Sequence, residues 1–176
     1  MSWIGARGPW LLLLAALGWS GLSLWLGVSG LAPTRAPWLG VKLLRVAPED
    51  WYFAQALLIP AVLTAQVLVM ARVGVWFAQR RGVVMRAARF ARPLAGSLGL
   101  SLLLGLVIPD LLAFALWGQD GLRSALRVTA LATPVLALAL VSATVRRVLI
   151  TGWLASVGIA WVMLLLQAVL GGLLLR

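Results

Sequence analysis

The chain has 176 residues, of which 63% are hydrophobic and 11% are charged, and its mean hydropathy is +1.05. Soluble domains are about 45–50% apolar and ~25% charged, so this composition excludes an ordinary water-soluble fold and makes lipid the expected solvent. The formal net charge is +11 without any recognisable nucleic-acid-binding motif, so we assign the excess of Lys and Arg to membrane loops and expect no nucleic-acid partner.

Uncharged apolar runs of about 20 residues are long enough to cross the hydrocarbon core of a bilayer as helices. We predict five spans in a single domain, 1–176, at residues 9–31, 51–77, 94–117, 128–145 and 149–175. The first run exceeds the 7–15 apolar residues of a cleavable signal, so we expect a retained signal anchor. The predicted fold class is all-α, an integral membrane bundle of five transmembrane helices.

A basic loop, residues 78–93, joins the second and third spans and carries five arginines with no acid among them: Arg80, Arg81, Arg86, Arg89 and Arg92. If residues 80–92 form a helix, all but Arg80 fall within one arc, as in helices that lie flat on a membrane. Two interpretations stay open. The loop either only orients the neighbouring spans, or it also binds an acidic protein or an anionic lipid headgroup.

Counting Lys and Arg on each side of the five spans gives nine on the side of the N-terminus and six on the other side. By the positive-inside rule this favours a cytoplasmic N-terminus and an external C-terminus. The expected location is the bacterial cytoplasmic (inner) membrane.

Polar residues within the spans are few. Asp110 follows Pro109 in the third span, and counting along the helix puts it near the outer interface, where it would cap a broken turn or meet Arg123. The alternative is a proton or cation site, because ionisable residues in spans are often functional. Gln55 and Gln66 would then line a polar path with it.

Small residues recur at intervals of four in two of the spans, which is typical of close helix contacts in lipid. They are Ser97, Ser101 and Gly105 in the third span, and Gly152, Ser156 and Ala160 in the fifth. Lipid-facing low complexity is the alternative explanation of the same pattern.

The chain has no Cys and no His, which excludes thiolate and imidazole chemistry. Glu49 and Asp50 precede the second span and are better suited to a helix N-terminus than to a catalytic pair. We therefore expect no catalytic residues, no metal site and no cofactor. The function predicted is that of a non-enzymatic scaffold or accessory subunit that binds membrane lipids and other membrane proteins, or itself. The alternative is a transporter or channel component with a polar path near Asp110.

Residues 48–110 resemble bacterial members of the Yip family, the Ypt/Rab-interacting multi-pass membrane proteins. The likeness lies in the aromatic start "WYFAQ", Pro60 within the span, the basic loop with Gly82 and Met85, and "RPL" followed later by "IPD". The resemblance implies five spans, a cytoplasmic N-terminus and a membrane organiser that binds other membrane proteins or lipids.

Overall fold

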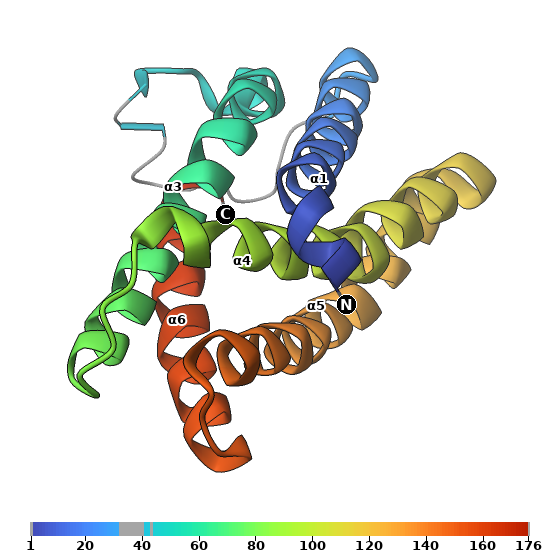
Figure 1. Cartoon of the computed structure of the whole chain (residues 1–176). Helices are drawn as coiled ribbons and strands as arrows, with labels where there is room; N and C mark the ends of the chain where they lie inside the picture. Colours follow the sequence, from blue (N-terminus) through green and yellow to red (C-terminus); the bar gives the residue numbers. More distant parts are fainter. Residues whose placement is uncertain (1, 32–40, 43, 176) are drawn as a thin grey trace.

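A computed structural model describes residues 2–31, 41–42 and 44–175 of the chain, and side chains from Arg7 onward. No strand occurs among these residues, so the all-α prediction is confirmed for the described part of the chain. The elements are α1 (Ser2–Val28), the 3-10 turn η1 (Pro48–Asp50), α3 (Trp51–Gln79), α4 (Ala87–Leu102), the π-helical turn η2 (Leu103–Val107), α5 (Ile108–Leu149) and α6 (Trp153–Leu174), as Figure 1 shows.

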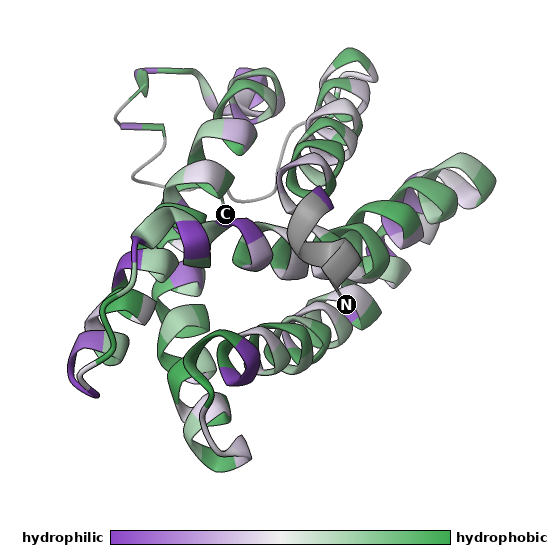
Figure 2. Cartoon of the chain, in the orientation of Figure 1, coloured by the Kyte–Doolittle hydropathy of each residue, from purple (hydrophilic) through white to green (hydrophobic). Residues whose placement is uncertain are grey.

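Four helical stretches among the described residues are long and apolar enough to cross a membrane: Arg7–Val28, Pro48–Gln79, Ala87–Leu149 and Trp153–Leu174. Their outward faces are apolar too, since Leu57, Leu131 and Leu154 are 81%, 75% and 86% exposed. Figure 2 shows hydrophobic colouring on much of the helix surface. Such surface is unfavourable in water and favourable in lipid, so the chain is an integral membrane protein.

The longest stretch is folded back on itself at Gly118, whose φ of 62° and ψ of −144° lie outside the helical region. Three hydrogen bonds join the two arms: Ser97 with Thr144 at 2.6 Å, Thr133 to the carbonyl of Gly105 at 2.7 Å, and Thr129 to Asp110 at 3.2 Å. Residue numbers rise along one arm as they fall along the other, so the arms are antiparallel. Figure 1 shows the chain running out through η2 and returning through the orange part of α5.

Helix α1 runs parallel to the first arm of this hairpin, because Gly8 lies against Arg92, Leu11 against Gly99, and Gly18 against Val107 in the same order along both elements. By contrast α3 is antiparallel to α1: Ser20 donates a hydrogen bond to the carbonyl of Ala56 at 2.8 Å, and Ser23 to the Oε1 of Gln55 at 3.3 Å. Small and hydroxyl side chains thus bring the helices together, as is usual in lipid.

Helix α6 packs antiparallel to α3 and completes the bundle. Gln55 donates to the carbonyl of Leu175 at 2.9 Å, and Gln66 donates to the carbonyl of Gln167 at 3.0 Å. The carbonyl of Leu175 follows the last turn of α6, where backbone acceptors have no intrahelical partner. Gln55 therefore caps the end of a helix more than one hundred residues away in the sequence.

Several boundaries differ from the sequence prediction, including the first helix, which covers Ser2–Val28 rather than residues 9–31. The arginine segment does not form a helix over 80–92: α3 ends at Gln79, Gly82 adopts a φ of +74°, and α4 begins only at Ala87. The last helix begins at Trp153 and not at residue 149, because Ile150 ends α5 in the left-handed region with a φ of 51°. The spans were predicted from runs of uncharged residues. Hydropathy alone does not reveal where the backbone leaves the helical conformation.

Candidate functional site

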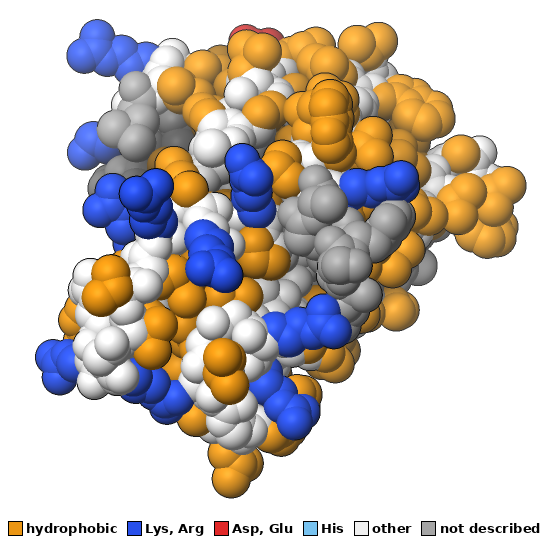
Figure 3. Space-filling model, in the orientation of Figure 1, with side chains coloured by type: hydrophobic (Ala, Val, Ile, Leu, Met, Phe, Trp, Pro, Cys, Tyr) orange, Lys and Arg blue, Asp and Glu red, His pale blue; other side chains and the backbone are white. Residues whose placement is uncertain are grey.

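Arginines gather at one end of the bundle. Gly8 of α1 lies against Arg92 of α4, Gly74 of α3 lies against Phe90 of α4, and the hairpin brings the end of α5 back to the same end. This arginine surface comprises nine exposed residues: Arg7, Arg72, Arg80, Arg81, Arg86, Arg89, Arg92, Arg146 and Arg147. Figure 3 shows Lys and Arg side chains spread over this face, with acidic colour only at its edge.

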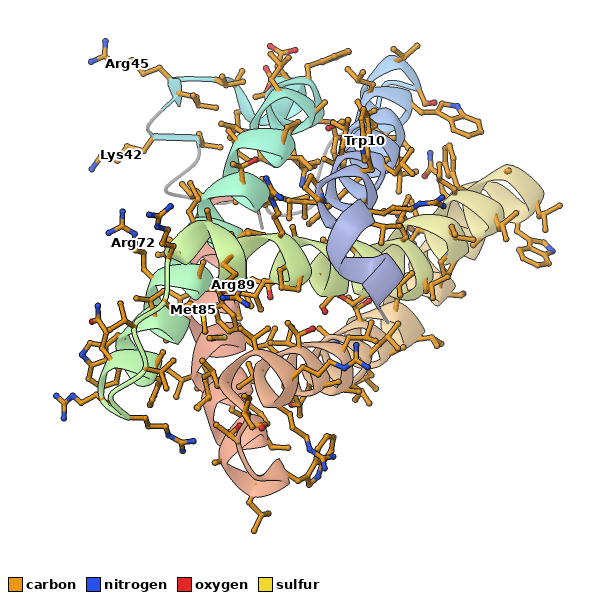
Figure 4. The ribbon with its side chains drawn as sticks, in the orientation of Figure 1. Trp10, Lys42, Arg45, Arg72, Met85 and Arg89 are labelled. Atoms are coloured by element: carbon orange, nitrogen blue, oxygen red, sulfur yellow. The ribbon has the colours of Figure 1, made fainter. Side chains whose placement is uncertain are left out.

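The five predicted arginines of the loop contribute to the surface from different local structures. Arg80 and Arg81 lie in the turn that ends α3, Arg86 is the N-cap residue of α4, and Arg89 and Arg92 lie on α4 itself. Figure 4 labels Arg72 and Arg89, whose side chains lie near that of Met85. The surface is therefore assembled from helix ends rather than from one amphipathic helix.

The four acids lie away from the arginine surface. Glu49 and Asp50 form the turn before α3, at the opposite end of that helix. Asp120, at the tip of the hairpin, forms an ion pair with Arg123 at 3.7 Å between two exposed side chains. Asp110 is buried, with 1% of its surface exposed. The charge of the arginine surface is therefore predominantly positive.

Tryptophans lie beside this surface, as at membrane interfaces. The guanidinium group of Arg80 lies 4.6 Å from the ring centre of Trp76, and that of Arg146 lies 6.0 Å from the ring centre of Trp153. Cation–π contacts of this kind hold a guanidinium group over an apolar ring while leaving its edge open to an anion. The rings of Trp76 and Trp153 thereby help to orient these two arginines.

An apolar groove of 340 Å³ opens between α1, α3 and α4 next to the arginine surface. Its walls include Pro9, Leu12, Pro60 and Leu63, and Arg92 lies at its edge. Both prolines lie inside helices. An apolar wall therefore adjoins a guanidinium group in this groove.

A second cavity, of 260 Å³, opens between α1, α3, η2, α6 and the two arms of the hairpin, and Ala130, Pro134 and Gly172 of its wall are exposed. We name it the inner cavity. Its walls are mainly apolar, but four polar residues line it: Gln66, Thr129, Thr133 and Gln167. Gln66 is 3% exposed and Thr129 is also 3% exposed. Hydroxyl and amide side chains at such depth usually bond across helices in membrane bundles.

Asp110 reaches this cavity through Thr129, whose hydroxyl donates a hydrogen bond to the carboxyl group at 3.2 Å. From the sequence we expected Asp110 to lie near the outer membrane interface, where it would cap a broken turn or meet Arg123. Instead it lies buried within the hairpin, and Arg123 forms its ion pair with Asp120. Counting residues along a helix gives depth along its axis, but it does not reveal which side faces another helix.

Of the three residues of the predicted polar path, only Gln66 lines the cavity, while Asp110 lies behind Thr129 and Gln55 donates to the carbonyl of Leu175, a wall residue. Sequence reasoning missed Thr129 and Thr133. Their spacing of four residues puts both on one face of α5, which is a signal that would have found them.

Among the described residues no group of three or more His, Cys, Asp or Glu side chains is arranged to hold a metal ion. Comparison with protein-family models, with curated proteins and with solved structures finds no match to this chain. The arginine surface and the inner cavity are the candidate functional sites.

Proposed function

We propose that the chain is a five-span protein of the bacterial cytoplasmic membrane, with its N-terminus in the cytoplasm and its C-terminus outside. A straight helix over the 63 residues of Ala87–Leu149 would be ~95 Å long, about three times the hydrocarbon core. Folding at Gly118 divides this stretch into two antiparallel arms, which supports two crossings. The parallel packing of α1 and α4 supports the same direction for the first and third spans.

Within this topology the arginine surface faces the cytoplasm and binds the phosphate groups of anionic phospholipids. The observation that carries this proposal is the gathering of nine exposed arginines at one end of the bundle, with all four acids elsewhere. Juxtamembrane cationic clusters are attracted to anionic leaflets, and guanidinium groups bind phosphate oxygens in pairs. The apolar groove beside Arg92 would take part of an acyl chain.

The biological role that this binding supports best is that of a non-enzymatic scaffold or accessory subunit, which organises lipid and neighbouring membrane proteins or copies of itself. The resemblance to bacterial Yip proteins favours the same role. Exposed leucines along every crossing would meet lipid or such partners.

The test replaces Arg80, Arg81, Arg86 and Arg89 together by Gln and measures bound phosphatidylglycerol by native mass spectrometry of the protein in mild detergent. We expect fewer bound anionic lipids and a weaker dependence on salt, because four of nine cationic groups are lost. The matched control replaces Lys42, Arg45, Arg123 and Arg127, which removes the same charge outside the arginine surface. Lys42 and Arg45 point away from the bundle (Figure 4).

Equal loss of lipid in both variants, or retention in both, would refute a specific arginine surface. The first result would reflect net charge alone, and the second would leave the arginines with a purely topogenic role. Because removing loop charges sometimes inverts a membrane protein, the orientation of each variant is checked by the labelling experiment given in the Discussion.

Transport of a small polar solute is a second candidate function, and the inner cavity favours it. Gln66, Thr129 and Thr133 form a polar strip in a wall that is otherwise mainly apolar, and Asp110 lies behind Thr129. Flux through proteoliposomes, compared between the wild type and Asp110→Asn, tests this function. Equal leakage by both proteins and by empty liposomes would exclude it.

A further inference from the structure

The amide group of Gln66 is incompletely bonded. Its Nε2 donates a hydrogen bond to the carbonyl of Gln167 at 3.0 Å, while its Oε1 is buried without a partner. The orientation of the amide is fixed, because a carbonyl oxygen only accepts hydrogen bonds and must face the NH2 group. Gly171 leaves room for this contact, since a Cβ there would lie 3.1 Å from the Nε2.

An unpaired acceptor at this depth costs free energy, because the bilayer interior has no water to replace the missing donor. Ser142 Oγ is the other buried side-chain atom without a partner in the described part of the chain, but Ser142 is not part of the wall of the inner cavity. Gln66 is part of that wall, so its unpaired Oε1 is the acceptor that we assign to a molecule in the cavity.

The neighbouring hydroxyl groups offer this molecule lone pairs rather than protons. Thr129 donates its proton to Asp110, and Thr133 donates its proton to the carbonyl of Gly105 at 2.7 Å. Each oxygen retains acceptor capacity toward the cavity. Behind Thr129 lies the carboxyl group of Asp110, which accepts the proton of that hydroxyl. A wall that offers acceptors suits a group that only donates, and an ammonium group has three N–H donors and no acceptor.

The rest of the wall restricts the size and shape of the occupant. Leu63, Leu102, Leu106 and Pro134 supply apolar contact, and the ring of Trp19 borders the same space. A bare inorganic cation would need oxygen ligands on most sides, which this wall does not provide. An organic cation matches both the polar and the apolar part of the wall. Its N–H groups would lie on the polar strip, and its carbon atoms would lie against the leucines and the ring.

We infer that the inner cavity is a binding site for a small protonated primary amine with a short apolar chain. Its ammonium group donates to the Oε1 of Gln66 and to the hydroxyl oxygen of Thr129 or Thr133, close to Asp110. The biological role of this site rests on the transport proposal. Binding of the amine is measured separately from flux. Binding without flux would exclude transport and leave the site in place.

The experiment uses the full chain in mild detergent and three probes at equal concentration: n-propylammonium chloride, 1-propanol and tetramethylammonium chloride. Propanol carries a donor without charge, and tetramethylammonium carries charge without an N–H group. We expect only n-propylammonium to raise the unfolding temperature in a saturable way, since a ligand of the folded state stabilises it by mass action. Calorimetric titration gives the dissociation constant.

Gln66→Met removes the unpaired acceptor while keeping the shape of the side chain. We expect an unfolding temperature equal to or above that of the wild type, because no buried acceptor is then left unsatisfied. At the same time we expect affinity for n-propylammonium to fall at least tenfold. A loss of binding without a loss of stability separates a ligand contact from a structural role.

Gln55→Met is the matched control, because Gln55 is a buried glutamine on the same helix whose amide is bonded at both atoms. We expect this variant to unfold at a lower temperature and to keep its response to n-propylammonium. The inference is wrong if no probe stabilises the wild type, if all three probes act alike, or if Gln66→Met binds n-propylammonium as tightly as the wild type.

Discussion

At the scale of single residues, the bundle depends on positions where a side chain is missing. A Cβ atom on Gly99 would lie 2.5 Å from the backbone of Leu11 and Leu12, so α1 and α4 touch backbone to backbone at this point. Gly158 of α6 has nothing within 4 Å of the same position. Both glycines lie inside helices, but of the two only Gly99 fixes a helix contact.

Gly99→Ala is therefore expected to destabilise the protein by about 1–3 kcal/mol, because the methyl group would force two helices apart. Gly158→Ala should leave stability unchanged or raise it by up to ~1 kcal/mol, since Ala favours helix over Gly. Thermal unfolding in detergent, followed by intrinsic tryptophan fluorescence, measures both. Equal unfolding temperatures for the two variants would contradict the proposed contact.

Hydroxyl and amide side chains act at the same scale. Most of those that are buried bond to a neighbouring helix: Ser20 and Ser23 reach α3, Gln55 reaches the end of α6, and Ser97 reaches Thr144 across the hairpin. Such bonds are worth roughly 0.6 kcal/mol each on average in membrane proteins, so they act mainly by selecting the register of the helices. Gln66 stands apart because half of its amide is left for a ligand.

At the scale of elements, the hairpin of α4 and α5 is the feature that builds the inner cavity. Gly118 reverses the chain with a backbone conformation that is almost restricted to glycine. The π-helical turn η2 adds a second irregularity, and the carbonyl of Gly105 within it accepts a bond from Thr133. Irregular turns of this type often lie at functional sites.

We expect Gly118→Ala to cost about 1–3 kcal/mol, because a Cβ is disfavoured at a φ of 62° and a ψ of −144°. Gly172→Ala, on α6 with open space around it, serves as the control. Thermal unfolding compares the two variants. If both unfold at the wild-type temperature, the reversal at Gly118 is not a strained position and the hairpin would need another explanation.

At the scale of the whole molecule, the direction of each helix determines which ends face the cytoplasm. The chain has no cysteine, so single cysteines report topology without background. Val84 in the basic loop is 99% exposed, and Ile150 between α5 and α6 is 92% exposed. Asp120 lies at the tip of the hairpin, and Glu49 lies before α3.

The five-span proposal predicts opposite labelling of these two pairs in intact cells by a membrane-impermeant maleimide. Glu49→Cys and Asp120→Cys should react at once, whereas Val84→Cys and Ile150→Cys should react only after the inner membrane is permeabilised. A hairpin that does not cross the bilayer would place residues 84 and 120 on the same side. Full inversion of the pattern would refute the cytoplasmic N-terminus and, with it, the contact of the arginine surface with the inner leaflet.

Composition and hydropathy were sufficient to predict a helical membrane protein, because apolar runs of this length have no other stable solvent. The sequence also located the small residues of the third span correctly: Ser97, Ser101 and Gly105 are all buried, and two of them bond to the returning arm. Both properties are local, since they depend on hydrophobicity and spacing within one segment.

Only the tertiary structure decided what the polar residues face. Gln66, Thr129 and Gln167 are far apart in the sequence, and no local pattern predicts that packing of the hairpin with further helices brings them to one cavity. The same holds for the arginines, which meet through the ends of separate helices rather than along an amphipathic one. The physical reason is that burial and partnership are set by how helices pack against one another, whereas the sequence of a single helix fixes only its length and its preference for lipid.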